Sequence, residues 1–383
     1  MKVKFISSIL VIILLAAILL VACGEETAAP APGPAAPAPG PAAPAPGPAP
    51  APGPAPAPGP AAPVEVIELV YSTTSPEVHS KTRLEVSWCE EIEEKSNGRV
   101  KFTYYYGGSL MPSAEVQKGI RGGIADVAPC AIDSQYVPIS YNIAYLPFMG
   151  YDSMPMQTWV YKQLYDAFPE IRAEFEGVKL LVARSMPPNL IHTVNKPVRL
   201  PADMRGMKLG AQGAMAQVVD LAGGAPVNLN PPDFYMSLER GLVEGLINHF
   251  PVTDMFKSIP FMPYHTFPGD GGIGMMLTSM QMNEETWNNL PADIQKIVED
   301  ANDRHREEVV AMSLGEVDKA MNTGRELNHD FIYLTPAELD AWKFLTRPLH
   351  DKWIEETEAK GKPGQAIYDM AKSLIAEYAK ANP

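Results

Sequence analysis

Hydroxyl and imidazole side chains follow a short apolar run near the start of the folded part of this sequence. Residues 66–71 predict a buried strand, and the polar turn after it contains Thr74, Ser75 and, a little further on, His79. Such side chains donate and accept hydrogen bonds, so at a strand end they are suited to holding a small molecule. Thr74 and Ser75 have an alternative role, because hydroxyl groups in front of a helix also cap its first turn.

A second polar turn follows residues 124–128, which predict another short strand. Cys130, Asp133 and Ser134 lie just beyond it. In an open α/β sheet the loops after parallel strands meet at one edge, and ligands bind there. We therefore expect Asp133 to open on the same binding cleft as the turn around Thr74.

The sequence does not arrange these residue types for catalysis. It contains no His-Glu-x-x-His helix, no Gly-x-Ser-x-Gly turn, no phosphate-binding loop and no paired-cysteine metal motif. The glycines of residues 269–274 lack the strand-to-helix spacing of a dinucleotide site. We therefore expect a protein that binds a small molecule without changing it and without a cofactor. The sequence leaves open whether a metal ion accompanies the ligand.

The elements around these turns alternate between strand and helix. Leu84, Trp88 and Ile92 lie four residues apart, which predicts an amphipathic helix that ends near residues 96–98, Ser-Asn-Gly. Residues 100–104 then alternate apolar and polar side chains, which is the pattern of a strand. This strand-helix-strand order predicts an α/β fold.

The chain beyond residue 64 is long enough for two lobes. Strands are predicted at residues 180–183 and 191–194, with Met-Pro-Pro at 186–188 as the crossover between the lobes. Apolar residues at helical spacing predict a long helix from about residue 290 to 328, which would lie across both lobes. We expect one lobe to contain residues 65–186 and 275–315, and the other to contain residues 187–274 and 316–383.

The N-terminal residues have the charge order of an export signal. Lys2 and Lys4 precede a long uncharged apolar run, and residues 20–23, Leu-Val-Ala-Cys, resemble the bacterial lipobox. We expect residues 1–22 to be a cleaved signal peptide and Cys23 to carry the lipid. An uncleaved membrane-spanning anchor is the alternative. Either form tethers the rest of the chain outside the cytoplasm.

The next segment, residues 23–64, begins with the lipidated cysteine and consists almost entirely of alanine, proline and glycine. Such a composition offers little apolar surface to fold upon, so we expect an extended spacer. The whole chain has 45 acidic and 31 basic residues and a formal charge of −14, which excludes nucleic acid as a partner of the folded part. Cys89 and Cys130 are expected to be buried and reduced, not joined in a disulfide.

Four blocks of the sequence resemble, in order and in spacing, the DctP-like solute-binding proteins of tripartite ATP-independent periplasmic (TRAP) transporters. The most specific is residues 200–245, which include Pro-Ala-Asp-Met-Arg-Gly-Met-Lys-Leu from residue 201. The other blocks are residues 95–110, 119–128 and 282–308. The resemblance implies a periplasmic-binding-protein-like fold in which hinge strands join two α/β lobes and a long helix bridges them.

The resemblance also implies a function. Members capture a small organic acid or related solute outside the cytoplasm, in the periplasm or at the cell surface. They deliver it to the small and large TRAP membrane subunits, which import it. Two alternatives share the binding fold: a ligand-binding sensor, and the binding protein of an ABC-type importer. The four blocks and the long helix favour the TRAP assignment over the ABC importer.

This sequence departs from the family at two positions that bear on the ligand. Most members place an arginine, which binds a carboxylate through two parallel hydrogen bonds, where this chain has Gly210. A second arginine position corresponds to Asn189, which we still expect to contact the ligand. Gln212 lies two residues beyond Gly210, on the same side of an extended chain, and is expected to donate an amide hydrogen bond. The identity of the ligand is therefore open.

Further ligand contacts are expected from their position. Asn248, His249 and Phe250 lie where the family turns from the second lobe toward the hinge, and would grip a planar or partly apolar ligand. For His249 the alternative is an ordinary loop histidine held by the backbone. Arg184 either points into the cleft or pairs with an acidic neighbour, and Tyr235 either stacks on the ligand or packs on its own helix.

Overall fold

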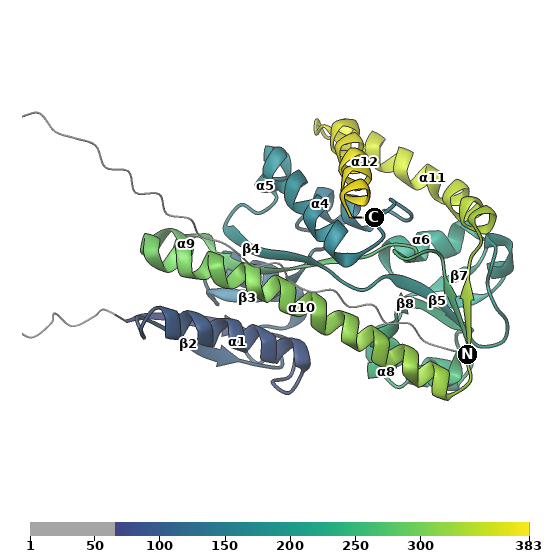
Figure 1. Ribbon diagram of the computed structural model, residues 1–383, viewed down its shortest axis with the longest axis horizontal. Coiled ribbons are helices and arrows are strands. Elements are labelled where there is room, and N and C mark those ends of the chain that lie inside the picture. Colours follow the sequence, from purple (N-terminus) through teal and green to yellow (C-terminus); the bar gives the residue numbers. More distant parts are fainter. Residues whose placement is uncertain (1–65, 383) are drawn as a thin grey trace, which may run out of the picture. The chain divides into compact units, whose positions relative to one another are not determined.

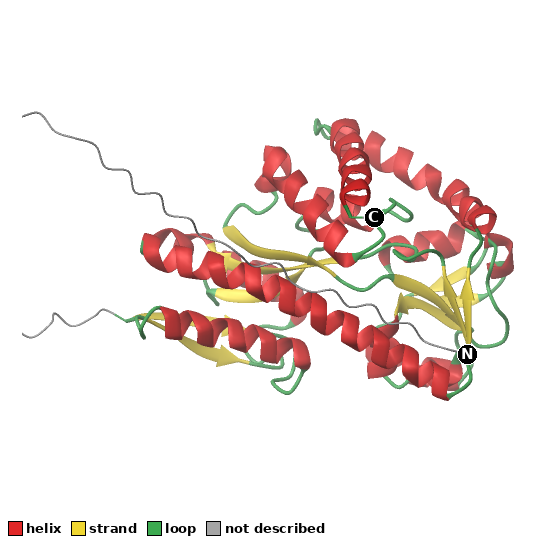
Figure 2. Ribbon diagram, viewed as in Figure 1, coloured by secondary structure: helices red, strands yellow, loops and turns green. Residues whose placement is uncertain are grey.

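A computed structural model describes residues 66–382 of the chain. The predicted signal peptide (1–22), the lipidation site Cys23 and the spacer (23–64) lie outside the described residues. The described part contains two β-sheets with helices packed on them (Figure 2). No helix within it is both long and apolar enough to span a membrane.

The first sheet, sheet A, has the strand order β2-β1-β3-β10-β4. Strand β1 (Ile67–Ser72) is parallel to β2 (Val100–Tyr105) and to β3 (Val127–Ala131). Strand β10 (Leu277–Asn283) runs antiparallel to both β3 and β4 (Val178–Ser185). The carboxyl ends of β1, β2, β3 and β4 therefore lie at one edge of the sheet, which we call carboxyl edge A.

The second sheet, sheet B, has the strand order β11-β9-β5-β8-β6-β7. Its strands are β11 (Asp330–Tyr333), β9 (Tyr264–Phe267), β5 (Asn189–Thr193), β8 (Gly245–His249), β6 (Lys208–Gly210) and β7 (Ala225–Val227). Strands β6, β7 and β8 are parallel, and β5 is antiparallel to β8, so that Asn189 at the start of β5 pairs with His249 at the end of β8. The edge formed by the ends of β6, β7 and β8 is carboxyl edge B.

The two carboxyl edges meet at the crossover between the sheets. Residues 186–188 connect the end of β4 to the start of β5, as the sequence predicts. The returning segment between β9 and β10 runs beside them, and the Asn189 N–H donates to Gly274 O over 2.9 Å. Gly272 has a φ of +59°, and a Cβ atom there would lie 2.4 Å from the Asn189 carbonyl oxygen, so this close approach requires glycine.

The helices cover both sheets. They are α1 (Ser80–Lys95), α2 (Val116–Arg121), α3 (Pro138–Tyr145), α4 (Met154–Ala167), α5 (Pro169–Ala173), α6 (Gly213–Leu221), α7 (Phe234–Glu239), α8 (Phe250–Met255), α9 (Glu284–Asn289), α10 (Ala292–Glu326), α11 (Pro336–Ala359) and α12 (Gly364–Ala381). Helix α10 has 35 residues, which corresponds to about 50 Å. It packs against α1 on sheet A and against α8 beside sheet B, which confirms the predicted bridging helix (Figure 1).

The core under α1 explains why the helix docks on sheet A. Trp88 and Ile92 on the apolar face of α1 pack with Leu69 of β1 and with residues of α10. The Trp88 indole N–H donates to the Asn302 side chain of α10 over 3.0 Å, so burial leaves this polar atom satisfied. Cys89, beside Trp88, and Cys130 are buried free cysteines, as predicted.

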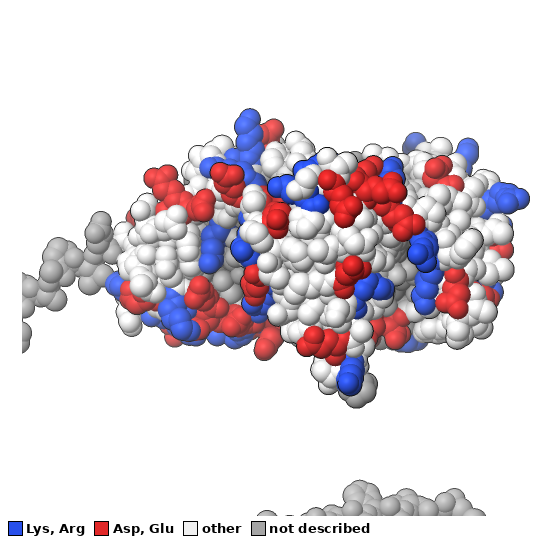
Figure 3. Space-filling view, turned by 90° about the horizontal axis from the view of Figure 1, so that it is seen from above, with Lys and Arg blue, Asp and Glu red and all other residues white. Residues whose placement is uncertain are grey.

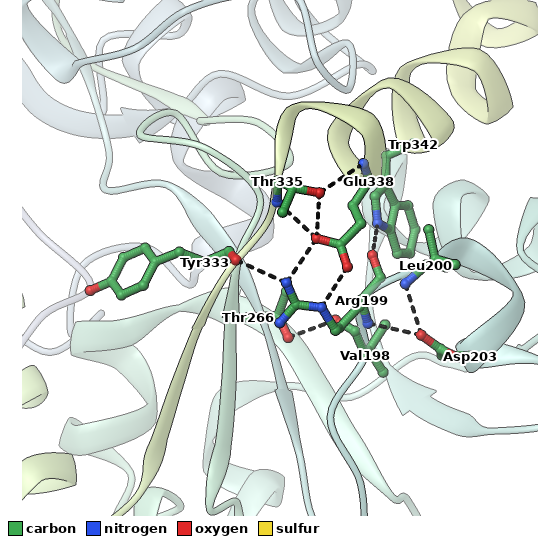
Figure 4. Close-up of polar contacts among 9 residues, drawn as sticks. All are labelled: Val198, Arg199, Leu200, Asp203, Thr266, Tyr333, Thr335, Glu338 and Trp342. Carbon is green, nitrogen blue, oxygen red and sulfur yellow. Dashed lines mark hydrogen bonds and ion pairs between the residues drawn. The ribbon is translucent and has the colours of Figure 1, made fainter.

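Helix α11 is anchored to sheet B by the polar cluster in Figure 4. The Arg199 guanidinium binds the Glu338 carboxylate through two hydrogen bonds of 2.5 and 2.8 Å. The same carboxylate accepts from the Thr335 N–H at 2.8 Å, which closes a capping box at the start of α11. The Trp342 indole donates to the Arg199 carbonyl over 2.8 Å and joins the helix to the loop before β6.

The C-terminal part of the chain differs from the predicted lobe boundaries. Residues 316–383 were all expected in the second lobe. Helix α12 instead packs against α4 and α3, and its buried residues Ile367 and Ala371 belong to the core of sheet A. The chain crosses back because α11 begins on sheet B and turns into α12 at residues 360–363.

Acidic and basic side chains are interspersed over the face that carries α4, α11 and α12 (Figure 3). No continuous basic patch is visible among the described residues on that face. Nucleic-acid backbones are bound by clustered lysine and arginine, and the described residues on this face do not form such a cluster.

We predict that Glu338→Gln lowers the thermal unfolding temperature by a few degrees at pH 7, because it breaks both the ion pair and the capping box. Its Arg199 partner holds the pKa of Glu338 down to about 2. The stabilisation is therefore present above the ordinary carboxyl pKa and is lost as the pH falls toward 2. The wild-type and variant melting temperatures should converge over that range, as measured by calorimetry.

Glu355→Gln is the matched control, because this exposed glutamate lies on the same helix and has no ion-pair partner among the described residues. A Glu338→Gln protein that melts like the wild type at pH 7 would show that the cluster does not anchor α11.

Candidate functional site

The turn after β1 is held at carboxyl edge A by backbone hydrogen bonds. The Thr73 N–H donates to Tyr105 O and the Gly107 N–H donates to Ser75 O, each over 2.9 Å. Helix α1 is capped by His79, whose Nδ1 accepts from the Lys81 N–H at 3.3 Å. The capping alternative for Thr74 and Ser75 is therefore wrong. Thr74 is exposed and Ser75 half-buried, at an edge where a ligand can reach them.

Asp133 follows β3 at the same edge. One of its carboxylate oxygens accepts from the backbone N–H groups of Gln135 at 2.9 Å and Tyr136 at 3.3 Å. This arrangement shapes the loop before α3 and leaves the second oxygen available. Asp133 is suited to a hydroxyl or amino group of a ligand and repels a carboxylate.

Arg184 lies at the end of β4, but the structure points its side chain into the lobe. The side chain is fully buried, and its guanidinium donates to Glu85 Oε1 over 3.0 Å and to His305 Nε2 over 2.9 Å. Burial lowers the pKa of His305 to about 3, so its imidazole is neutral and accepts this hydrogen bond. Of the two predicted roles for Arg184, the structure has the pairing with an acidic neighbour.

Glu85 is the centre of this buried cluster. Its second oxygen accepts from the Tyr71 hydroxyl at 2.7 Å, and the Lys81 ammonium lies 3.7 Å from the first. Burial raises the pKa of Glu85, but Lys81, Arg184 and the Tyr71 hydrogen bond outweigh burial and hold it below its ordinary value. Lys81 keeps 24% of its side chain exposed, so it is the member of the cluster that solvent can reach.

At carboxyl edge B, Gly210 stands at the first position where most family members have an arginine, and neighbouring side chains fill the space beside its Cα atom. A Cβ atom on Gly210 would lie 2.5 Å from the Leu246 side chain and 3.1 Å from that of Leu229. The Asn189 side chain is 5% exposed and donates to the Gly274 carbonyl of the crossover over 3.0 Å. It also hydrogen-bonds the Tyr145 hydroxyl. Neither position presents a cation, and the Asn189 amide is used by the hinge.

Gln212 precedes α6 at the same edge. Its side-chain amide donates to Leu229 O over 2.8 Å, and its carbonyl remains free to accept from a ligand. The next residue, Gly213, has a φ of +54° and lies against Tyr141 of α3, a helix on sheet A. The two lobes therefore touch beside Gln212.

Asn248 and His249 end β8 and face the crossover. The Asn248 carbonyl oxygen accepts from the His249 N–H over 2.8 Å, which fixes the amide and leaves its NH₂ group free. His249 is half-buried, and its Nδ1 atom is buried without a hydrogen-bond partner among the described residues. Burial lowers the pKa of His249 to about 4, so the ring is neutral at pH 7. An unpaired buried ring nitrogen favours a ligand contact over a backbone-held loop histidine.

Two predicted contacts lie elsewhere. Phe250 is 1% exposed and packs with His192, His265 and Phe331 in the core between sheet B and α10. It starts α8, and this turn reverses its side chain relative to His249. Tyr235 lies on α7 and packs edge-on against Phe261, with ring centroids 5.0 Å apart, which matches the packing alternative.

Lys81, Glu85, Tyr71 and Tyr141 were not expected at the site. A signal for two of them was present, because Lys81 and Glu85 extend the Trp88 and Ile92 stripe of α1 at four-residue spacing. Charged side chains on the buried face of a helix indicate a paired or functional cluster. Tyr141 had no such signal, since its contact with α6 depends on how the lobes close.

A separate groove of about 720 Å³ lies between α4, β4 and α10. Its walls include Trp159, Leu180 and Val310. All three elements pack on sheet A, so hinge motion would not close this groove around a ligand. No group of three or more histidine, cysteine or acidic residues suited to a metal ion occurs within residues 66–382.

Comparisons with known proteins agree on one family. A family profile described as DctP, bacterial extracellular solute-binding protein, family 7, matches residues 71–357. A solute-binding protein of Albidiferax ferrireducens is 25% identical over 220 residues, 56% of this chain and 63% of that protein. The C4-dicarboxylate-binding periplasmic protein DctP of Rhodobacter capsulatus is 23% identical over 292 residues, 71% of this chain and 82% of that protein.

A solved structure has the same fold. A TRAP solute-binding protein from Rhodoferax ferrireducens T118, in complex with copurified benzoate, superposes with a TM-score of 0.73 at 17% identity. The match covers 83% of this chain and 100% of that chain.

We predict that Glu85→Gln destabilises the protein by about 3–5 kcal/mol, because it leaves the buried Arg184 guanidinium without its carboxylate. Urea denaturation at pH 7 measures the loss. Glu90→Gln, at an exposed position of the same helix, should change the free energy of unfolding by less than about 0.5 kcal/mol. Equal stabilities of the two variants would contradict the assigned role of Glu85.

We also predict that Gly213→Ala lowers the unfolding temperature, because its methyl group would lie 2.2 Å from the Tyr141 hydroxyl in a left-handed backbone conformation. Adding Tyr141→Phe should recover part of the loss by removing the clash. Gly315→Ala, where nothing lies within 4 Å of the added methyl in α10, should be neutral or stabilising. Scanning calorimetry of the four proteins tests this, and a Gly213→Ala protein as stable as the wild type contradicts it.

Proposed function

The chain belongs to the DctP family, family 7 of the bacterial extracellular solute-binding proteins, and from this membership we propose that it captures a small organic acid for a TRAP transporter. Members of the family are solute-binding receptors. The ligand is held between carboxyl edges A and B, and no bond is made or broken. The partners are the small and large TRAP membrane subunits.

One observation carries the proposal: polar groups with unused hydrogen-bonding capacity lie at the carboxyl edges of both sheets. His249 contributes a buried ring nitrogen, Asn248 an NH₂ group and Gln212 a carbonyl oxygen from sheet B. Lys81 contributes an ammonium group from sheet A. Polar groups with free hydrogen-bonding capacity on two edges joined by a hinge are suited to holding a small ligand.

The crossover provides the motion that a delivery protein needs. Two extended segments and the helices α10 and α11 connect the lobes, so a small change of backbone angles at residues 186–188 can open the edges. A ligand that touches both edges binds the closed state more tightly than the open state. This difference in binding free energy is what shifts the equilibrium toward the closed state. The membrane subunits then recognise the closed form.

The class of ligand follows from the charges and from the relatives. The R. capsulatus relative binds C4-dicarboxylates and the R. ferrireducens structure holds benzoate, so acids of different shape use this fold. In this chain the neutral residues Gly210 and Asn189 stand at the two arginine positions, and the side chains of Gln212, Asn248 and His249 at edge B are neutral as well. We therefore favour an acid with one carboxylate over a dicarboxylate.

The anchor is part of the proposal. Cys23 receives lipid after cleavage of residues 1–22, and the spacer of residues 23–64 lets the binding domain reach the membrane subunits from the envelope surface. Mass spectrometry of Cys23 in membranes from the native host tests this. An unmodified Cys23 on an uncleaved chain would overturn it.

We predict that, after unfolding and refolding to remove carried-over ligand, the protein is stabilised against heat by at least one of benzoate, mandelate, lactate and succinate. His249→Ala should weaken binding about tenfold, since it removes one ligand hydrogen bond. His329→Ala is the control, because it precedes β11 at the opposite edge of sheet B. Calorimetric titration measures both variants, and equal losses would place the ligand outside the two edges.

A second candidate function, a sensor that uses the same domain without transport, makes a different prediction. Import of the labelled acid by cells should then be unchanged when the gene is deleted. Loss of import on deletion, restored by the wild-type chain, supports transport.

A further inference from the structure

The buried cluster at carboxyl edge A contains more positive than negative charge. Lys81 and Arg184 are both basic, and Glu85 is the single carboxylate that they share, at 3.7 and 3.0 Å. Tyr71 donates its proton to Glu85, and His305 is neutral because burial lowers its pKa to about 3. One basic group therefore lacks a carboxylate of its own.

Arg184 is the basic group that holds direct hydrogen bonds within the cluster. It is fully buried and holds Glu85 and His305 at hydrogen-bond distance. Lys81 is farther from Glu85 than a hydrogen bond requires and retains exposed surface. Burial lowers the pKa of Lys81, Glu85 raises it, and Arg184 lowers it again.

The position of Lys81 directs it toward the crossover. It lies in the first turn of α1, on the same face as Glu85 and Trp88, and this helix starts beyond the carboxyl end of β1. A side chain there covers carboxyl edge A on the α1 side of the sheet. The residues opposite, on edge B, are neutral, because His249 has a pKa of about 4 and Gln212 and Asn248 are amides.

We infer that Lys81 binds the carboxylate of the solute, and that Glu85, held by Arg184 and Tyr71, positions its ammonium group. The inference rests on the proposed function and adds the residue that recognises the acid. It also sets the class of solute. One available cation facing neutral groups selects a monocarboxylate, whose remaining part meets His249, Asn248 and Gln212.

The other charged side chains near the cluster are not placed to bind the carboxylate of the solute. The Asp133 carboxylate binds backbone N–H groups of its own loop and is partly exposed to solvent. On α10, Glu316 accepts from the Ser80 hydroxyl over 2.6 Å. Arg121 lies over the Tyr136 ring and donates to backbone carbonyls of residues 174 and 176. Among the described residues of this edge, Lys81 is thus a basic side chain that solvent can reach and whose one carboxylate partner, Glu85, is shared with Arg184.

The test compares each acid with its uncharged amide. The refolded wild-type protein is titrated with benzoate, mandelate and lactate, and with benzamide, mandelamide and lactamide. We expect at least one acid to bind about tenfold or more tightly than its amide. Lys81→Met should lose this preference, because the affinity for the acid should fall about 10- to 100-fold while the affinity for the amide stays unchanged. Lys81→Arg should retain part of it.

Arg83→Gln is the matched control. Arg83 is an exposed basic residue two positions along the same helix turn, so the variant removes one positive charge without touching the cluster. The dissociation constant of this variant for the acid should stay within about twofold of the wild-type value. A Lys81→Met protein that binds the acid like the wild type overturns the Lys81 inference and leaves the proposed function standing. A wild type that binds none of the acids overturns both.

A second measurement does not depend on how the variants fold. Lysines of the wild-type protein are acetylated with a limiting reagent, with and without the bound acid, and quantified by mass spectrometry. Lys81 should react several-fold more slowly in the presence of the acid, whereas Lys101, which is half exposed beside Glu93, should not change. An unchanged Lys81 rate under saturating acid contradicts the inference.

Discussion

The crossover between β4 and β5 determines where the remaining parts of this protein meet. Residues 186–188 are too few to separate the ends of the two sheets, and the hydrogen bond from Asn189 to Gly274 holds the returning segment beside them. The parallel strands of each sheet therefore end at the same place. Gly272 allows this approach, since any side chain there would collide with the Asn189 carbonyl. The candidate site follows from this geometry, because the crossover brings loops from both sheets together, and Gly213 of one lobe lies against Tyr141 of the other.

Electrostatics then gives the site its chemistry. In many binding sites a cation points at the ligand directly, whereas here the most buried cation, Arg184, points inward and holds a glutamate. A buried pair of this kind adds little net stability, but breaking it is costly, so it fixes the geometry around it. Lys81 lies at the rim of that arrangement with an incomplete partner. The facing edge carries neutral groups, and His249 stays neutral because it is buried. This division of charge between the lobes explains how an acid is recognised across a hinge.

The sequence predicts the architecture well because the architecture depends on periodic patterns. Trp88 and Ile92 at helical spacing, the alternation in residues 100–104 and the long apolar repeat of α10 each describe one element, and each appears near the expected position. The site was predicted less completely. The ligand contacts of His249 and Asn248 stay predictions made from their family position, whereas the inward turn of Arg184 depends on Glu85, which is 99 residues away. Phe250 was misplaced because α8 begins at the residue directly after β8 ends, and its ring packs into the core between sheet B and α10. Helix α12 returns to sheet A through contacts between distant segments, which no local pattern encodes.

The most direct test of this account is a crystal structure of the refolded protein with the tightest-binding monocarboxylate. The account predicts the carboxylate about 3 Å from the Lys81 ammonium, with the rest of the ligand against His249 and Asn248. A ligand bound in the groove between α4 and α10, or one whose carboxylate contacts neither Lys81 nor carboxyl edge B, would contradict it.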